Sequence, residues 1–353
     1  MKRLHIKTPG WLLLLGALLS CFASLPAFAA PPLRVCATVP ELGGLVRAVG
    51  GDQVAVTVFA KGTEDPHYLD AKPSFIKALS QADLFIQIGM DLEAGWAPLL
   101  LRSSRNARVQ PGGSGFLDAS VVITPLEVPS GPVDRSMGDI HPQGNPHYLA
   151  DPLAGLKVAA LIRDRLAELR PEAAGLFSQR YEAFRMKLAE AMVGPGLAGK
   201  FEIEKLALLY QQGRLTDFLR QQGDPEAFGG WLGRLHPFFG ARILTYHSSW
   251  PYFAERFGLV VVGQLEPKPG IPPGPGHLLE VVRTAQAQKA AVILMEPWLS
   301  RKPADLVAEK TGVRVVQAAT SVSGGAKGYD YLAAIDEVVR RLAEGLAGVS
   351  REA

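Results

Sequence analysis

Hydrophobic and polar positions follow two different periods along this chain, and the two periods alternate many times. Short runs in which apolar residues alternate or cluster predict strands, and longer runs with helical spacing predict helices. The first part of the chain predicts strand 33–39, helix 42–49, strand 53–59, helix 74–81, strand 82–88 and strand 121–123. Strands that are separated by helices pair in parallel, so these residues predict one α/β lobe.

The middle of the chain predicts helices without strands. Asp151 precedes Pro152, which is typical of a helix start with a capping carboxylate, and apolar residues recur at helical spacing through Leu169. A second helix is expected over 171–192, where no glycine occurs beyond Gly175. At 1.5 Å per residue, roughly 20 residues span about 30 Å. We therefore expect a stiff helical connector.

The second half of the chain repeats the alternation of strands and helices. The predicted strands are 241–246, 259–265, 290–296 and 313–317, and the predicted helices are 250–257, 278–288, 304–311 and 331–346. The fold class is therefore α/β, with two parallel-sheet lobes joined by a long rigid helix. We assign residues 30–152 to an N-terminal lobe, 153–193 to the helical connector and 194–353 to a C-terminal lobe.

The first 29 residues differ from the rest of the chain. Basic residues precede an apolar run at 11–19, and residues 27–29 have the small-x-small pattern of a signal-peptidase site. We expect residues 1–29 to be a signal peptide, which makes the mature protein periplasmic or otherwise extracytoplasmic. A lipid anchor on Cys21 is the less favoured alternative, because Leu-Leu-Ser-Cys resembles a lipobox only weakly.

Charge excludes several classes of function. Residues 1–29 contain three of the 37 basic residues and none of the 34 acidic ones, so the mature chain carries 34 charges of each sign. Such a chain has no bulk attraction to nucleic acid or anionic lipid. No apolar stretch beyond the signal approaches the roughly 20 residues of a membrane helix. We expect a soluble protein, with Cys36 as the single cysteine of the mature chain.

Three histidines lie in loops where chemistry is expected. His67 occurs in Asp-Pro-His, His147 in Asn-Pro-His-Tyr and His247 in Thr-Tyr-His-Ser-Ser. Ligands bind beyond the carboxyl ends of parallel strands, and neutral imidazoles from separate loops suit zinc. The chain has no His-Glu-x-x-His or Cys-x-x-Cys signature, so spacing alone leaves open whether each histidine is a ligand or a hydrogen-bonded loop residue.

The remaining histidines of the mature chain are expected to have roles other than metal binding. His236 is expected to be structural, and His277 is expected to start a helix. His141 lies in the polar loop 134–143, where a solvated side chain is favoured over a metal ligand.

Four motifs together resemble a known family. They are Gly-Thr-Glu-Asp-Pro-His at 62–67, the segment 89–96 with its glutamate and tryptophan, Gly-Asn-Pro-His-Tyr-Leu-Ala-Asp-Pro at 144–152, and Tyr-His-Ser-Ser-Trp-Pro-Tyr-Phe at 246–253. Over nearly all of its mature length the chain resembles the zinc/manganese solute-binding proteins of bacterial ABC transporters, the adhesin-like cluster A-I.

The resemblance implies a site and a function. It makes His67 and His147 of the N-terminal lobe and His247 of the C-terminal lobe ligands of a metal ion in the cleft between the lobes. It also implies that the protein captures a divalent transition metal and delivers it to an ABC permease in the membrane. We expect such a protein to be a monomer.

The chain departs from the family at the fourth ligand. Proteins of this kind usually carry an aspartate in a late loop that corresponds here to 317–322, which contains no carboxylate. Either water completes the site or another carboxylate does. Glu266, directly after a predicted strand, is our first candidate, and Glu296 is the second. Both are open to a simpler interpretation as loop-capping carboxylates.

Ligand type favours zinc over manganese. Family members that take manganese tend to replace the third histidine by glutamate, and oxygen-rich sites suit manganese, so His247 indicates zinc. One alternative is an extracytoplasmic zinc-dependent hydrolase, since three histidines and a water also describe a catalytic zinc site. A binder of an organic solute is another. The chain has no Gly-x-Ser-x-Gly, Walker or dinucleotide motif, and we expect it not to be an enzyme.

Overall fold

The computed structural model describes residues 30–133, 138, 140–319 and 329–349. The predicted signal peptide with Cys21, and residues 320–322 of the late loop, lie outside the described residues. The chain divides into residues 1–32 and residues 33–353, and the fold described below is that of the second unit. No helix in the described part of the chain is both long enough and apolar enough to span a bilayer.

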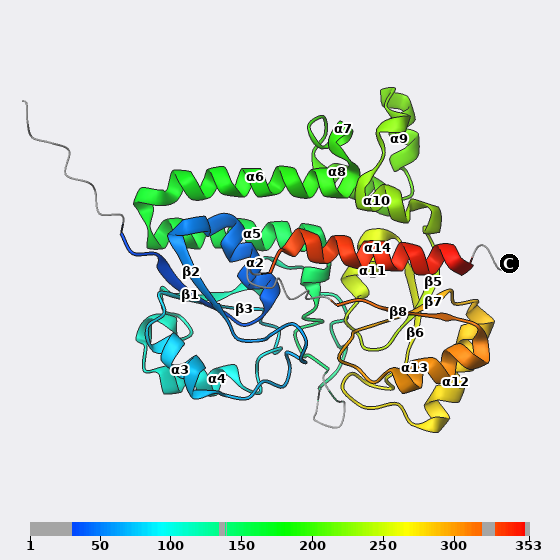
Figure 1. The fold of residues 1–353 in the computed structure, drawn as a ribbon, viewed down its shortest axis with the longest axis horizontal. Coiled ribbons are helices and arrows are strands. Elements are labelled where there is room, and N and C mark those ends of the chain that lie inside the picture. Colours follow the sequence, from blue (N-terminus) through cyan, green and yellow to red (C-terminus); the bar gives the residue numbers. More distant parts are fainter. Residues whose placement is uncertain (1–29, 134–137, 139, 320–328, 350–353) are drawn as a thin grey trace, which may run out of the picture. The chain divides into compact units, whose positions relative to one another are not determined.

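The first sheet is parallel and has the strand order β2-β1-β3-β4. Its strands are β1 (Leu33–Ala37), β2 (Val54–Val58), β3 (Leu84–Gln87) and β4 (Phe116–Asp118). Helix α2 (Pro40–Gly50) lies on one side of the sheet, and α3 (Pro73–Ser80) and α4 (Ala97–Ser104) lie on the other (Figure 1). The first lobe is therefore the predicted α/β arrangement, with α4 as an additional helix.

The prediction of a strand at 121–123 is wrong. The edge strand β4 ends at Asp118, and residues 119–122 form a 3₁₀ turn instead. The cause is local, because the Asp118 carboxylate accepts hydrogen bonds from the backbone N–H and the hydroxyl of Ser120, at 2.9 and 2.6 Å. A side chain that caps a turn in this way competes with continued strand pairing.

The second sheet repeats the first in order and direction. Its order is β6-β5-β7-β8, with β5 (Arg242–Thr245), β6 (Val260–Gln264), β7 (Val292–Met295) and β8 (Arg314–Gln317), all parallel. The connecting helices are α11 (Pro251–Phe257), α12 (Pro275–Gln288) and α13 (Arg301–Thr311). In both sheets the chain order reverses beside the first strand, which is where open parallel sheets bind ligands.

Long helices connect the two sheets. Helices α5 (Pro152–Leu169) and α6 (Ala174–Val193) pack against each other and against α2, and α6 also contacts α14 (Tyr331–Val349), which packs on β7 and β8. Figure 1 shows α6 passing from the first sheet toward the helices of the second half. At 20 residues, α6 spans about 30 Å. The expected stiff helix between the lobes is present.

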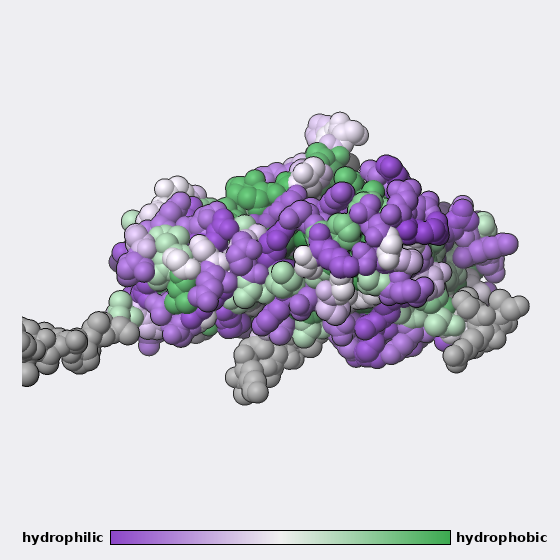
Figure 2. Space-filling view, turned by 90° about the horizontal axis from the view of Figure 1, so that it is seen from above, coloured by the Kyte–Doolittle hydropathy of each residue, from purple (hydrophilic) through white to green (hydrophobic). Residues whose placement is uncertain are grey.

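Short helices follow α6 where the sequence analysis expected no particular structure. They are α7 (Pro195–Ala198), α8 (Ile203–Gln211), α9 (Leu215–Gln222) and α10 (Gly230–Leu235). Seen from the side that carries α6, the surface is mostly hydrophilic, and hydrophobic side chains form small separate areas (Figure 2). The face of α6 that carries Phe177, Phe184 and Leu188 is buried instead.

The larger hydrophobic core is continuous between the lobes. It includes Val35 of the first sheet, Ile162 of α5, Val339 of α14 and Ile243 of the second sheet. A smaller core, which includes Leu244 and Val281, fills the space between the second sheet and α12 and α13. The lobes therefore share buried surface, and the lobe limits at residues 152 and 193 stay a prediction. Cys36 is buried, which raises the pKa of its thiol to about 12 and disfavours the thiolate.

Candidate metal centre

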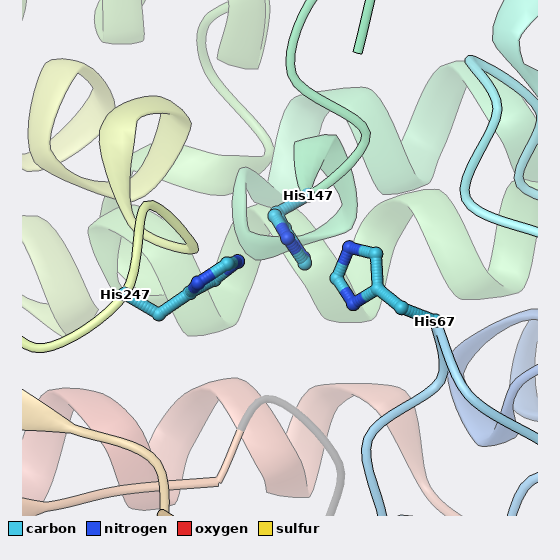
Figure 3. Close-up of side chains that lie close together, drawn as sticks. All are labelled: His67, His147 and His247. Atoms are coloured by element: carbon cyan, nitrogen blue, oxygen red, sulfur yellow. The ribbon is translucent and has the colours of Figure 1, made fainter. Parts of the chain in front are cut away.

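Three histidines from separate loops point toward one another in the cleft between the sheets (Figure 3). His67 follows β2, His147 precedes α5 and His247 follows β5. Each offers one ring nitrogen such that the three atoms lie within 4.8 Å of one another. The ring centroids are 5.4 Å apart for His67 and His147, 5.6 Å for His67 and His247, and 5.4 Å for His147 and His247. A small shift of these rings would bring the nitrogens to zinc-binding distance.

The same local motif positions two of the three histidines. The Asp65 carboxylate accepts the backbone N–H of His67 at 2.9 Å, and the Asn145 side-chain oxygen accepts the backbone N–H of His147 at 2.9 Å. In both turns a side-chain oxygen accepts the backbone N–H of the residue two positions later. The proline between the two residues fixes the backbone there. The sequence Asx-Pro-His therefore indicates a histidine whose backbone is held in one conformation.

Carboxylates bind two of the imidazoles at Nδ1, on the side of the ring that faces away from the cluster. His67 Nδ1 donates to Asp65 at 2.7 Å, and His247 Nδ1 donates to Glu266 at 2.7 Å. This fixes the tautomer, so that Nε2 of both rings is an acceptor that faces the cleft. Hydrogen bonding to His67 lowers the pKa of Asp65 despite its burial. Burial would lower the pKa of His247, but the hydrogen bond to Glu266 and nearby carboxylates raise it overall.

His147 carries a buried nitrogen that has no bonding partner. Among the described residues, nothing forms a hydrogen bond with its Nε2. Burial, followed by the neighbouring histidines, lowers the pKa of His147 far below its usual value, so the ring is neutral. A buried acceptor without a partner costs roughly 1–3 kcal/mol, and a bound cation would satisfy it. The residues present therefore fit a metal ion.

Glu266 lies behind His247 rather than among the clustered nitrogens. Its carboxylate accepts His247 Nδ1–H and also the backbone N–H of Gly270 at 2.9 Å. Glu296, which follows β7, is fully buried, and its oxygens make no hydrogen bond in the described part of the chain. Burial raises the pKa of Glu296 to about 7. Neither carboxylate belongs to the cluster of ligand atoms.

Polar bonds between the lobes fix the histidines relative to one another. The Asn145 amide donates to the Ser248 carbonyl at 2.6 Å and to Glu127 at 2.8 Å, and Ser248 Oγ donates to Glu127 at 2.8 Å. Tyr252 of α11 donates to the Asn145 carbonyl at 2.9 Å. The residue two before His147 is therefore bonded to the residue directly after His247.

Sequence reasoning named two further groups, Trp96 and His141, but did not predict their contacts with the cluster. Trp96 Nε1 donates to the Pro66 carbonyl at 3.0 Å and so holds the loop that carries His67. His141 was expected to be solvated, yet it is partly buried and its Nε2 lies 3.3 Å from His67 Nε2. Burial, then the neighbouring His67 and His247, lowers the pKa of His141 to about 3. Because the loop is polar and contains no metal signature, its position was not predictable from spacing.

Comparison with known proteins identifies the family. The chain matches the model described as zinc-uptake complex component A periplasmic over residues 35–192 and 234–345, which is most of its length. The chain belongs to this family. The matched ranges contain all three clustered histidines and Glu266, whereas residues 193–233, which include α8 and α9, are not matched.

Individual relatives agree with the family match. The chain is 22% identical to the high-affinity zinc uptake system protein ZnuA of Yersinia pestis over 301 residues, 79% of this chain and 80% of the relative. It is 21% identical to the manganese-binding lipoprotein MntA of Halalkalibacterium halodurans over 319 residues, 90% and 89% of the two chains. A crystal structure of ZnuA has a TM-score of 0.64 at 23% identity and covers 89% of this chain and 99% of its own. The two-lobed fold is shared.

Proposed function

We propose that this protein is an extracytoplasmic solute-binding protein that captures zinc and delivers it to an ABC permease for import. The observation that supports this most directly is the cluster of three imidazole nitrogens within 4.8 Å, contributed by both halves of the chain. In this proposal His67, His147 and His247 bind the ion through Nε2. The ion is cargo, and a site assembled from two lobes can release it when local loop contacts change. The family, named for a periplasmic component of a zinc-uptake complex, supports the same function.

The choice of zinc rests on the donor atoms. Relatives are named for zinc, manganese and iron, so family membership alone does not select the metal. Imidazole nitrogen suits zinc, whereas carboxylate and water oxygen suit manganese. Three imidazoles form the cluster, and the carboxylates of Asp65, Glu266 and Glu296 lie outside it. This donor set favours zinc over manganese.

A hydrolytic role has less support than transport. A catalytic zinc needs a general base within hydrogen-bond reach of its water. The Glu266 carboxylate is already engaged with His247 and with the Gly270 backbone. The family is one of metal uptake, so we do not retain the hydrolase alternative. We further propose that the protein acts as a monomer with the permease as its membrane partner.

Zinc binding by the purified mature protein tests this function. After removal of metal with a chelator, calorimetry should give one zinc per chain, and zinc should raise the melting temperature. A ligand that binds only the native state contributes about 2.7 kcal/mol at 100 times its dissociation constant. Manganese at the same concentration should give a smaller shift. A stoichiometry near zero would refute the proposal.

Glu266→Gln should change how zinc binding depends on pH. Glu266 raises the pKa of His247, so protons compete with zinc for this ligand as the pH falls through that raised value. Without the carboxylate the His247 pKa should fall, and the pH at which affinity is lost should move down. At pH 8 affinity should drop by about 10- to 100-fold, as for other groups that orient a metal ligand.

Zinc competition assays between pH 5.5 and 8 would measure both effects. Glu280→Gln is a matched control, because the exposed Glu280 contacts His277 outside the cluster. An unchanged affinity at pH 8 in the Glu266→Gln protein would contradict the role of Glu266 behind His247.

A further inference from the structure

A fourth histidine approaches the cluster from the loop that crosses the cleft. His141 Nε2 lies 3.3 Å from His67 Nε2, with the two ring centroids 5.3 Å apart and the ring planes inclined by 25°. His141 also lines, together with His147 and His247, a cavity of about 320 Å³. The loop therefore brings its imidazole to the same space as the other histidines.

In one tautomer of His141, its contact with His67 is not a hydrogen bond. His67 Nδ1–H donates to Asp65, which leaves Nε2 as an acceptor. A neutral imidazole has a single N–H, and in the tautomer that carries it on Nδ1 the Nε2 atom of His141 is also an acceptor. No N–H is then left to join the two Nε2 atoms. Two acceptors at this distance repel each other unless a cation lies between them.

The distance itself fits shared coordination. With zinc–nitrogen bonds of 2.0–2.1 Å, two ligands of a tetrahedral zinc lie about 3.3–3.4 Å apart. The observed 3.3 Å between His141 and His67 already equals that separation. The nitrogens of His67, His147 and His247, which lie within 4.8 Å of one another, need to move closer. His141 and His67 thus have the spacing of a ligand pair before the ion arrives.

The loop with His141 is held from both sides of the cleft. The backbone N–H of Gly144 bonds the His141 carbonyl at 3.1 Å, and Asn145 N–H bonds the Leu126 carbonyl at 2.8 Å. On the other side, Gly138 approaches Pro269 so closely that an added Cβ would lie 2.3 Å from the Pro269 carbonyl oxygen. Glu266 anchors the Pro269 loop through the Gly270 N–H. His141 is therefore positioned by contacts with both lobes.

We propose that His141 is the fourth ligand of the bound zinc ion, which makes the site a four-histidine tetrahedron. This rests on the proposed function and deepens it. The chain carries no carboxylate over 317–322, so the ligand that the late loop lacks is supplied from the opposite lobe. A site of four nitrogens discriminates further against manganese, which prefers oxygen.

Cobalt spectroscopy and zinc affinity of His141→Ala test the assignment. Co²⁺ in the wild-type protein should give the intense visible bands of a tetrahedral site with four nitrogen ligands. In His141→Ala, water replaces one nitrogen, so the bands should weaken and shift while the stoichiometry stays at one. Zinc affinity should fall by at least about 10-fold. This is the smallest loss expected even when a group that only orients a metal ligand is removed.

The controls separate this proposal from the function on which it rests. His236→Ala removes an exposed histidine that packs on Tyr210 and Phe228, away from the cluster, and should bind zinc and cobalt as the wild type does. Melting temperatures of the metal-free variants report on folding. If the wild type binds zinc and His141→Ala matches its affinity and cobalt spectrum, the fourth-ligand proposal is refuted alone. If the wild type binds no zinc, the proposed function fails as well.

Discussion

Replacing His67, His147 or His247 singly by alanine should weaken zinc binding by more than about 100-fold, the upper end of the effect expected for groups that only orient a ligand. Each substitution removes a nitrogen donor from a cluster whose atoms lie within 4.8 Å. Water would fill the position, but it is a weaker donor and is not held in place by the protein. Competition with a chromophoric chelator at pH 7.5 would measure the loss.

The three substitutions should not be equivalent in their effect on the metal-free protein. His147→Ala removes a buried nitrogen that has no partner in the described structure, so the apo protein should lose little stability there beyond the lost packing. His67→Ala and His247→Ala leave Asp65 and Glu266 without their imidazole partners. His277→Ala, which removes a histidine at the start of α12, is the control. A His247→Ala protein with an intact zinc site would contradict the three-histidine assignment.

The fold was predictable because its signals are local and repeated. Strand 54–58 and helix 152–169 each combine the expected period with a clear boundary, and the capping of α5 by Asp151 is directly observed through its bond to Leu153 N–H at 2.9 Å. Strands that alternate with helices then pair in parallel sheets. The positions of His67 and His247 beyond the ends of β2 and β5 follow from the same logic.

Other features depended on tertiary contacts or on side-chain bonds that the hydrophobic pattern does not reveal. Helices α8 and α9 are only nine and eight residues long, and they lie in the segment outside the family match. Neither the hydrophobic period nor the family resemblance therefore predicted them. His141 is near His67 because of how a loop crosses the cleft, 74 residues further along the chain. The strand predicted at 121–123 failed because the Asp118 side chain redirects the backbone. Each case is decided by tertiary contacts or by side-chain bonding.

A buried ion pair between the lobes is the clearest feature that the sequence pattern could not predict. Arg256 of α11 donates to both oxygens of Asp151, with Nε–Oδ1 at 2.7 Å and Nη2–Oδ2 at 2.8 Å, and each side chain is 12% exposed. Asp151 also caps α5, and its carbonyl accepts the Tyr331 hydroxyl of α14 at 3.3 Å. Asp151 lies four residues after His147. The sequence predicted the cap, but 105 residues separate the two charges.

Arg256→Met should destabilise the metal-free protein by about 3–5 kcal/mol, because it leaves the Asp151 carboxylate buried without its cation. Asp151→Asn is the matched partner: asparagine remains a good helix cap, so this variant loses the charge but keeps the bond to Leu153. Combining the two substitutions should cost less than the sum of the single effects, since the double variant contains no uncompensated charge. Denaturant unfolding of the four proteins in the presence of chelator would measure this coupling. Strictly additive effects would show that the pair contributes nothing beyond its separate contacts, and that the lobes are held together by the continuous core instead.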